Sequence, residues 1–350
     1  MKTGWRAPSN IALVKYWGKR AGQLPGNGSL SMTLDMASTT TFLTFTKNRD
    51  TGRPVEMEYF FHGERHEKFA RKIEALLTSL LHEFPFLADY KLAFHSENSF
   101  PHSAGIASSA SSMAALALCL VSMEESVRNR KLAPEAFLRR ASFIARLGSG
   151  SASRSIYGGL VGWGETDWIP GSSDEYATPV TLEPGSRFRQ LRDLILLVSP
   201  EEKEVSSSAG HALMADHPYR EGRKLQASQN LYEMGTAIRE NDFREFSRLT
   251  ENEALSLHAL LLSSHPGIVL LKPDTLGIIG EIRKFRAGTG LDLFFTIDAG
   301  PNVHLLYFED QRDRVLSFAG DILAPYCSEG RWLDDRMGAG PQLLMQPTEI

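Results

Sequence analysis

The chain has 350 residues, enough for about two domains, and its content of 42% hydrophobic and 23% charged residues is ordinary for a globular protein. A formal net charge of −4 excludes an overall basic field that would attract nucleic acid or an anionic membrane. The two cysteines, Cys119 and Cys327, lie far apart without a CxxC partner, which excludes a disulfide framework and a cysteine-rich zinc site.

Targeting and membrane segments are not predicted. The longest apolar run, 113–121, is far shorter than the roughly 20 residues that a membrane span needs. Residues 1–10 lack the apolar stretch and the cleavage site of a secretory signal. We therefore expect a cytoplasmic protein, with neither a membrane nor a nucleic acid as its partner.

Strand and helix patterns alternate along the first half of the chain. Residues 38–47 alternate β-branched and aromatic side chains and predict a strand, with 55–61 as its hairpin neighbour. Apolar residues spaced by three and four predict an amphipathic helix over 66–84. Residues 108–123 are apolar on nearly all sides, which is typical of a central, buried helix. Pro134 is a suitable first residue for a further helix that ends near Gly148.

A charged segment, 187–193, precedes a new apolar strand over 194–198, and we place a domain boundary near residue 190. This gives an N-terminal domain of residues 1–190 and a C-terminal domain of residues 191–350. Helices are predicted over 221–240, 242–263 and 275–285, and strands over 291–297 and 303–308. Strands separated by long helices indicate an α+β fold, and residues 342–350 are expected to be loose.

A loop rich in Gly, Ala and Ser runs from Pro101 into the predicted buried helix at Ser108. Small side chains let a ligand approach the backbone, and a helix N-terminus offers free N–H groups to an anion. The loop lacks the GxxxxGK[ST] pattern and is not a Walker A loop. A phosphate cradle and a simple serine helix cap are equally good interpretations of this segment alone.

A second Gly/Ser segment, 148–159, contains Arg154. Its guanidinium, with hydroxyl and backbone N–H groups around it, would suit a carboxylate or a phosphate. A solvated loop is the alternative that its composition alone favours.

Lys15 lies in an apolar segment, where a buried ammonium would need a carboxylate partner, although an edge strand with Lys15 facing water would fit too. Asp298 follows an aromatic strand and precedes a Gly-Pro turn, so it is either an acidic group in a cleft or a turn residue.

No HExxH pattern occurs, and we expect His102, His211 and His304 to be structural or solvated rather than metal ligands.

Together these segments resemble the diphosphomevalonate decarboxylase family of the GHMP kinase superfamily. The resemblance is ordered along most of the chain and rests on NIALVKYWGKR at 10–20, LPGNGSLS at 24–31, PHSAGIASSA at 101–110, RLGSGSASRSIYGG at 146–159, TIDAGPN at 296–302 and GAGPQ at 338–342.

The resemblance implies a GHMP kinase fold, with an N-terminal domain like domain 2 of ribosomal protein S5, a ferredoxin-like C-terminal domain and the active site between them. It implies a homodimer that uses ATP with Mg²⁺. The implied reaction is a carbon–carbon lyase reaction of the mevalonate pathway, in which diphosphomevalonate and ATP give isopentenyl diphosphate, ADP, phosphate and CO₂.

The resemblance also implies roles for individual residues. Asp298, supported by Lys15, would face the hydroxyl at carbon 3, and Arg154 would hold the carboxylate. The remaining substrate-binding residues would be Asn10, Tyr16, Lys19, Ser149, Gly150, Ser151 and Ser207, and those around the ATP phosphates would be Pro101, Gly105, Ala107, Ser108 and Ser109.

The chain departs from the family pattern at His102 and Ser103 in the nucleotide loop, at Ser153, and at His211, where Met is usual. A phosphomevalonate decarboxylase or a mevalonate 3-kinase would be a sister activity on the same fold. A non-catalytic nucleotide-binding protein is the alternative from another class, and it would have no need of Asp298, Lys15 and Arg154.

Overall fold

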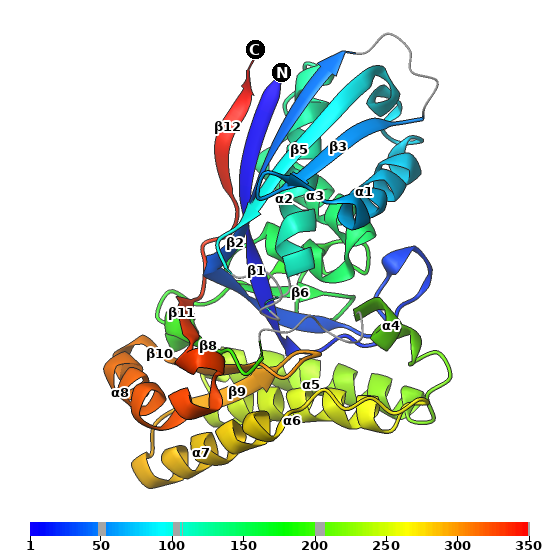
Figure 1. Ribbon diagram of the computed structural model, residues 1–350. Coiled ribbons are helices and arrows are strands. Elements are labelled where there is room, and N and C mark those ends of the chain that lie inside the picture. Colours follow the sequence, from blue (N-terminus) through cyan, green and yellow to red (C-terminus); the bar gives the residue numbers. More distant parts are fainter. Residues whose placement is uncertain (48–53, 101–105, 107, 200–206, 349–350) are drawn as a thin grey trace.

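Two β-sheets, each backed by helices, are stacked one above the other in the computed structural model (Figure 1). The structure describes residues 1–47, 54–100, 106, 108–199 and 207–348. The upper part contains β1 (Lys2–Val14), β2 (Ser29–Lys47), β3 (Glu56–Phe61), β4 (Glu64–Arg65), α1 (Glu67–Leu80), β5 (Tyr90–Asn98), α2 (Ser108–Val127), α3 (Pro134–Gly148), β6 (Leu160–Trp163) and β7 (Ala177–Pro179). The lower part contains β8 (Leu191–Leu196), α4 (Ser207–Ala212), α5 (Arg220–Glu240), α6 (Phe243–Leu262), α7 (Pro273–Thr289), β9 (Leu293–Ile297), β10 (Val303–Phe308), α8 (Arg312–Phe318) and β11 (Trp332–Arg336), and β12 (Gln342–Thr348) ends the chain.

The upper sheet has the strand order β12-β1-β2-β5-β3-β4, and β6 joins β2 at its lower end. The lower sheet has the order β11-β8-β10-β9 and is antiparallel throughout. β1 and β2 are long strands that run down from the upper sheet to the lower one (Figure 1). They therefore carry residues of the upper part directly to the junction between the two sheets.

The predicted α+β class is confirmed, as are the helices and most strands. α2 is the core helix of the upper part, and its residues from Ala110 to Glu125 are all buried. By length and composition alone it could cross a bilayer, but 89% of its apolar window is buried inside the molecule. The two cysteines, Cys119 and Cys327, are buried free thiols.

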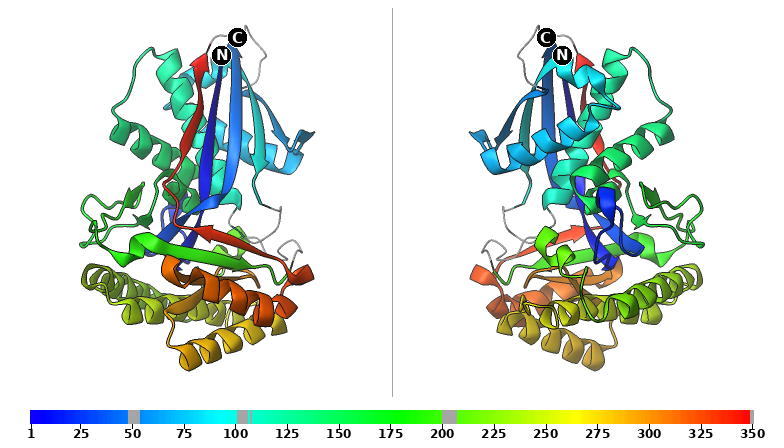
Figure 2. Two further views of the ribbon diagram at one scale, coloured as in Figure 1. Left: turned by 90° about the vertical axis from the view of Figure 1, so that its left-hand side faces the viewer. Right: turned by 90° about the vertical axis from the view of Figure 1, so that its right-hand side faces the viewer.

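Two expectations about strands were wrong. β3 is not the hairpin neighbour of β2, because β5 lies between them and pairs with both. Residues 342–348 are not loose: they form β12, which pairs with β1 at the edge of the upper sheet. The chain thus returns to its first sheet after the lower part is complete, as the red strand beside the N-terminus shows (Figure 2). The division into domains of 1–190 and 191–350 stays a prediction.

The two sheets are joined where β2 carries extra residues opposite β1. The pairing shifts from Pro8↔Ser38 to Asn10↔Thr33, so the segment 34–37 bulges out of the ladder. The N–H groups of Asp35, Met36 and Ala37 are taken up by the carboxylate of Asp335 in β11, at 2.8–2.9 Å. A single buried carboxylate therefore accepts the hydrogen bonds of the N–H groups in the bulge and attaches the lower sheet to the upper one.

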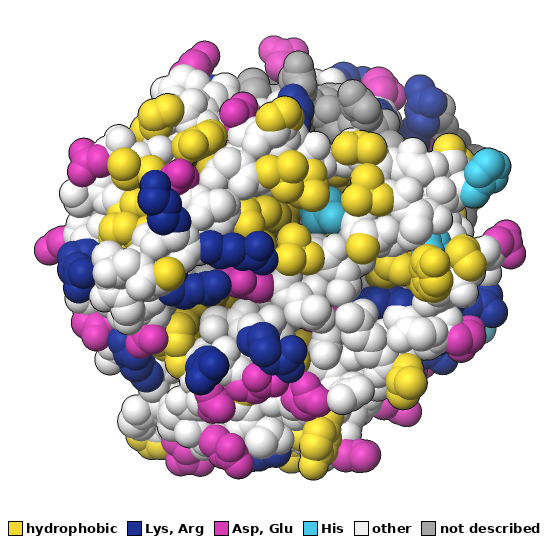
Figure 3. Space-filling model, turned by 90° about the horizontal axis from the view of Figure 1, so that it is seen from below, with side chains coloured by type: hydrophobic (Ala, Val, Ile, Leu, Met, Phe, Trp, Pro, Cys, Tyr) yellow, Lys and Arg dark blue, Asp and Glu magenta, His cyan; other side chains and the backbone are white. Residues whose placement is uncertain are grey.

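The lower face of the molecule is a mixed surface. Figure 3 shows Lys and Arg side chains interspersed there with Asp and Glu and with single apolar side chains. Exposed ion pairs such as Arg248–Glu245 on α6 belong to this kind of surface and contribute little to stability.

Replacing Asp335 by Ala should lower the free energy of unfolding by about 2–4 kcal/mol, because it leaves backbone N–H groups of the bulge without their charged acceptor. Denaturant unfolding measures this change. The matched control is Asp310→Ala, which removes an exposed carboxylate that pairs with Arg187 and should cost less than about 1 kcal/mol. Equal effects of the two substitutions would contradict the role of Asp335.

Candidate active site

A cavity of about 500 Å³ lies at the junction of the two parts. Its wall is built from the end of β1, the start of α2, the segment after α3, α4, α6 and the turn after β9. It is lined by Asn10, Ala12, Lys15, Tyr16, Trp17, Lys19, Gln23, Lys68, Phe69, Lys72, Ser109, Met113, Gly148, Ser149, Ser151, Arg154, His211, Leu257, Asp298 and Ala299. The segments that the sequence singled out separately therefore meet around one space.

Lys15 and Asp298 form an ion pair in this cavity, with Nζ donating to Oδ1 at 2.7 Å. Lys15 is the first residue after β1 and its side chain is 3% exposed, whereas that of Asp298, the first residue after β9, is 27% exposed. Burial lowers the pKa of the Lys15 ammonium, and the charge and hydrogen bond of Asp298 act in the opposite direction. The predicted carboxylate partner of a buried Lys15 is thus confirmed, and the edge-strand interpretation was wrong.

The main chain of Lys15 is held by a second, fully buried ion pair. Glu253 of α6 accepts the N–H of Lys15 through Oε2 at 2.8 Å, and Arg223 of α5 donates to the carbonyl of Lys15 at 2.7 Å. The two side chains bind each other through two parallel hydrogen bonds of 2.8 and 2.6 Å, and Asn230 donates a further bond to Glu253. This arrangement fixes where the Lys15 side chain begins.

Asp298 is held from the same helix. The Nε2–H of His258 on α6 donates to the main-chain carbonyl of Asp298 at 3.1 Å. α6 therefore fixes the backbone on both sides of the Lys15–Asp298 pair.

Arg154 is buried in the 3₁₀ segment Gly150–Ile156 that follows α3, not in a solvated loop. Its Nη1 donates to Ser29 at 2.8 Å, its Nε has no hydrogen-bond partner among the described residues, and none of the ion pairs within them includes it. The guanidinium lies 5.5 Å from the ring centre of Tyr16 and 5.7 Å from that of Trp163. Burial lowers its pKa to about 10, so it stays a cation at neutral pH.

The remaining predicted substrate residues lie around Arg154. Asn10 donates to the carbonyl of Ser151 and to Ser155 Oγ, at 3.1 and 2.8 Å, and Ser149 and Ser151 line the cavity. Gly150 lies beneath Tyr16, where an added Cβ would be 2.9 Å from the phenol oxygen. Close packing therefore explains the glycine.

Aromatic rings beside Arg154, and a lysine, form a further part of the wall. Tyr16 packs edge-on against Trp163 and stacks on His211, with ring centres 4.9 and 4.5 Å apart, and burial raises the pKa of its phenol to about 12. Burial and the neighbouring charge of Lys72 lower the pKa of Lys19. This part of the wall therefore combines apolar ring faces with a phenol hydroxyl and an ammonium group.

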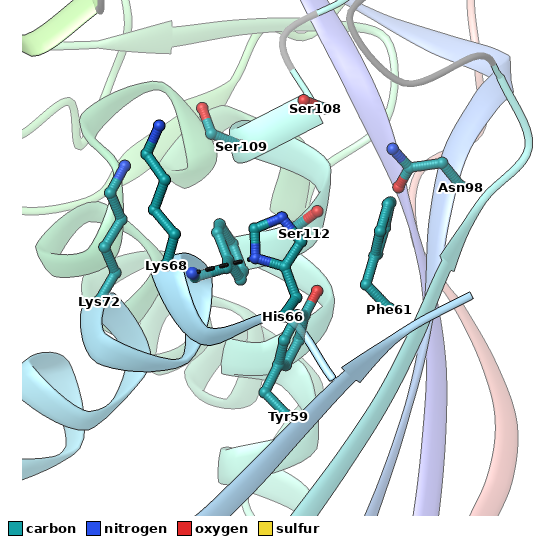
Figure 4. Close-up of a pocket in the computed structure, with 10 residues that line it drawn as sticks. Tyr59, Phe61, His66, Lys68, Lys72, Asn98, Ser108, Ser109 and Ser112 are labelled. Atoms are coloured by element: carbon teal, nitrogen blue, oxygen red, sulfur yellow. Dashed lines mark hydrogen bonds between the residues drawn. The ribbon is translucent and has the colours of Figure 1, made fainter. Parts of the chain in front are cut away.

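A second cavity of about 210 Å³ adjoins the first and shares Lys68, Phe69, Lys72 and Ser109 with it. Figure 4 shows Lys68 and Lys72 on α1 and Ser108 and Ser109 at the first turn of α2, all around this space. Hydroxyl groups at a helix N-terminus, faced by two ammonium groups, suit the phosphates of a nucleotide.

The predicted nucleotide residues Pro101, Gly105 and Ala107 lie outside the described residues, and so does His102. Ser207 begins α4, but its side chain is outside the described part of the chain. Expected site residues that line the cavities are Asn10, Lys15, Tyr16, Lys19, Ser108, Ser109, Ser149, Ser151, Arg154 and Asp298.

Sequence reasoning missed Lys68, Lys72, Arg223 and Glu253. Lys68 and Lys72 are four residues apart and so share one face of α1, a pattern that could have placed them together. Glu253 stands between Thr250 and Ala254 on the buried face of α6, and a charge on an apolar helix face calls for a partner. Nothing in the sequence names Arg223 as that partner.

Comparisons with known proteins agree with this geometry. The family model for the diphosphomevalonate decarboxylase-like N-terminal domain matches residues 7–177, and that for the mevalonate 5-diphosphate decarboxylase C-terminal domain matches residues 193–337. The diphosphomevalonate decarboxylase of Candida albicans is 33% identical over 324 residues, which are 89% of this chain and 85% of the relative.

Solved structures cover nearly the whole chain. The mevalonate diphosphate decarboxylase of Enterococcus faecalis is 29% identical, with a TM-score of 0.82 over 99% of both chains. A structure of MDDEF in complex with MVAPP, AMPPCP and magnesium is 30% identical, with a TM-score of 0.83 over 99% of both chains. The likeness thus covers 89% of the chain in sequence and 99% in three-dimensional structure, and the chain belongs to the diphosphomevalonate decarboxylase family.

Proposed function

We propose that this protein catalyses the ATP-dependent decarboxylation of mevalonate 5-diphosphate to isopentenyl diphosphate, ADP, phosphate and CO₂. The observation that carries the proposal is the content of one cavity: a buried arginine that has no carboxylate partner among the described residues, beside a Lys15–Asp298 ion pair. A buried guanidinium needs an anion, which a substrate carboxylate would supply.

In the first step the γ-phosphoryl group of ATP passes to the oxygen of the 3-hydroxyl group. Asp298 orients this hydroxyl and accepts its proton, while Lys15 holds the carboxylate in place at 2.7 Å. Lys68, Lys72, Ser108 and Ser109 would hold the ATP phosphates, and bound Mg²⁺ would supply further positive charge to neutralise the charge that develops on them.

In the second step the C–O bond to the new phosphate breaks, and phosphate leaves with the bonding electrons. Positive charge develops at carbon 3, where the Asp298 carboxylate stabilises it. The electrons of the C–C bond to the carboxylate then form the double bond as CO₂ departs. The substrate carboxylate loses its charge in this step. Arg154 therefore serves to orient the bound substrate rather than to stabilise the transition state.

The diphosphate would lie toward Tyr16, Lys19 and the Ser149–Ser151 turn, where hydroxyls and an ammonium line the cavity. Assembly as a homodimer and a cytoplasmic location stay predictions. A mevalonate 3-kinase would share the first step and release no CO₂, and a phosphomevalonate decarboxylase would accept one phosphate fewer. Release of ADP and CO₂ in parallel assays with mevalonate, its 5-phosphate and its 5-diphosphate distinguishes these activities.

Asp298→Asn should lower kcat by roughly 10²-fold or more, because it removes both the proton acceptor and the negative charge. The coupled ADP and CO₂ assay measures this with the 5-diphosphate. Asp292→Asn is the control, since Asp292 is a partly buried residue directly before β9 that lies outside the cavity and pairs with Arg187. If Asp298→Asn turns over like the control, the proposed chemistry is wrong.

Arg154→Lys should raise KM for the diphosphate substrate about 10-fold or more and lower kcat by no larger factor, because lysine keeps the charge but not the planar fork. Steady-state kinetics with saturating ATP separates the two constants. Arg187→Lys, at a partly buried arginine outside the cavity, should leave both unchanged. A fall in kcat with KM intact would overturn the orienting role of Arg154.

A further inference from the structure

The side chain of His211 is the one departure from the family pattern that the described residues place in the active-site wall. It belongs to α4, is 6% exposed and lines both the 500 Å³ cavity and a neighbouring cavity of about 590 Å³. Lys19 lines the same two cavities. The two side chains therefore lie at the junction of these spaces.

The hydrogen bonds of His211 fix its tautomer. The backbone N–H of Gly18 donates to Nδ1 at 3.1 Å, so Nδ1 carries a lone pair and no proton. A neutral imidazole with an acceptor at Nδ1 has its proton on Nε2. The ring is held in position between Tyr16 and Trp17, with a distance of 4.5 Å between ring centres on each side.

Burial and the charges that face His211 keep it neutral. Burial, Lys19 and Arg154 together lower its pKa to about 3, while Tyr16 stays an uncharged phenol at neutral pH. Nε2 has no hydrogen-bond partner among the described residues. The result is a rigid, uncharged N–H donor in a wall that already contains ammonium groups.

We propose that His211 is a specificity-determining residue, which donates its Nε2–H to the terminal phosphate of the diphosphate substrate beside Lys19. This inference rests on the proposed function. The terminal phosphate is the group in question because Arg154 is assigned to the carboxylate, and Lys19 and Tyr16, the neighbours of His211, lie where the diphosphate is placed. A neutral donor binds phosphate oxygens without adding to the repulsion among the cations.

Two substitutions test the contributions of the two ring nitrogens separately. Asn places an amide oxygen near the position of Nδ1 and keeps the acceptor for Gly18, but it lacks the outer donor. Gln places an amide nitrogen near the position of Nε2 and keeps the donor, but it loses the acceptor. His211→Asn should raise KM for the 5-diphosphate roughly 10- to 100-fold and change kcat less, and His211→Gln should stay within about 5-fold of the native protein.

Specificity gives a second readout. The ratio of kcat/KM for the 5-diphosphate to that for the 5-phosphate should fall about 10-fold or more in His211→Asn, because only the diphosphate has the terminal group. Equal losses with both substrates would overturn the assignment. A larger loss in His211→Gln than in His211→Asn would show that the ring acts only through Gly18, and would also overturn it.

His217 provides a matched control. It is as buried as His211, and its Nδ1 likewise accepts a backbone N–H, that of Tyr219, but its Nε2 already bonds to the carbonyl of Leu260 at 3.0 Å. His217→Asn should change stability without changing the substrate ratio.

A measurement on the native protein keeps the test independent of turnover and of variant folding. In ¹⁵N NMR spectra His211 should be protonated at Nε2 alone from pH 8 to pH 5. Its Nε2 resonance should shift when inorganic pyrophosphate is added, while that of His217 does not. If the enzyme releases no ADP or CO₂ yet this shift occurs, the proposed function fails and the anion contact stands. If turnover occurs without the shift, the inference about His211 fails alone.

Discussion

The buried pair of Arg223 and Glu253 determines the geometry of the whole site, because it binds the main chain of Lys15 from both sides. An isolated charge of either sign would be costly at this depth, and each side chain compensates the other through two hydrogen bonds. Both still have bonding capacity left, and they use it on the N–H and the carbonyl of one residue. The backbone of Lys15, from which its side chain extends, is thereby held in place by the lower helices.

The same helix positions the other half of the Lys15–Asp298 pair. Glu253 and His258 are five residues apart on α6, and they bind the backbone of Lys15 and of Asp298. Lys15 comes from the upper sheet and Asp298 from the lower one, 283 positions apart in the chain. An ion pair between strand ends of different sheets would shift with any relative movement of those sheets. Attachment of both backbones to one helix, and of β2 to β11 through Asp335, removes that freedom.

The local parts of this structure could be predicted from the sequence. Apolar spacing predicted α1, an almost wholly apolar composition predicted α2, and helical patterns predicted α5, α6 and α7, since such signals depend only on near neighbours. They could not predict that β5 enters between β2 and β3, or that β12 returns to β1, because strand pairing is a long-range choice among edges of similar composition. The strand 342–348 is short and lies at an edge, so little apolar alternation marks it.

The site shows the same division. Lys15, Arg154 and Asp298 could be found because charges in apolar or Gly/Ser segments are unusual and the order of the motifs resembles a family. Of the residues that hold them, Glu253 carries a signal, a charge on an apolar helix face, but its pairing with Arg223 follows only from the fold, which buries Arg223 and Glu253 at 3% and 0% exposure. Burial, not residue type, turns such groups into determinants of geometry.

The cations in the cavity differ in whether a carboxylate of the protein pairs with them, and this difference indicates a different role for each. Lys15 is paired with Asp298, so it adds little net charge and serves to place a carboxylate. Arg154 is buried without such a partner among the described residues, so it gains most from an incoming anion. Lys19 is less buried than these two, and partial burial together with the charge of Lys72 lowers its pKa. Burial, together with the charges of Lys19 and Arg154, lowers the pKa of His211 to about 3, so this imidazole adds no further charge to the wall at neutral pH. Once the ammonium groups are in place, additional affinity for phosphate oxygens in this wall is best supplied by a neutral N–H or O–H group, and Tyr16 and His211 are the side chains of that kind next to Lys19.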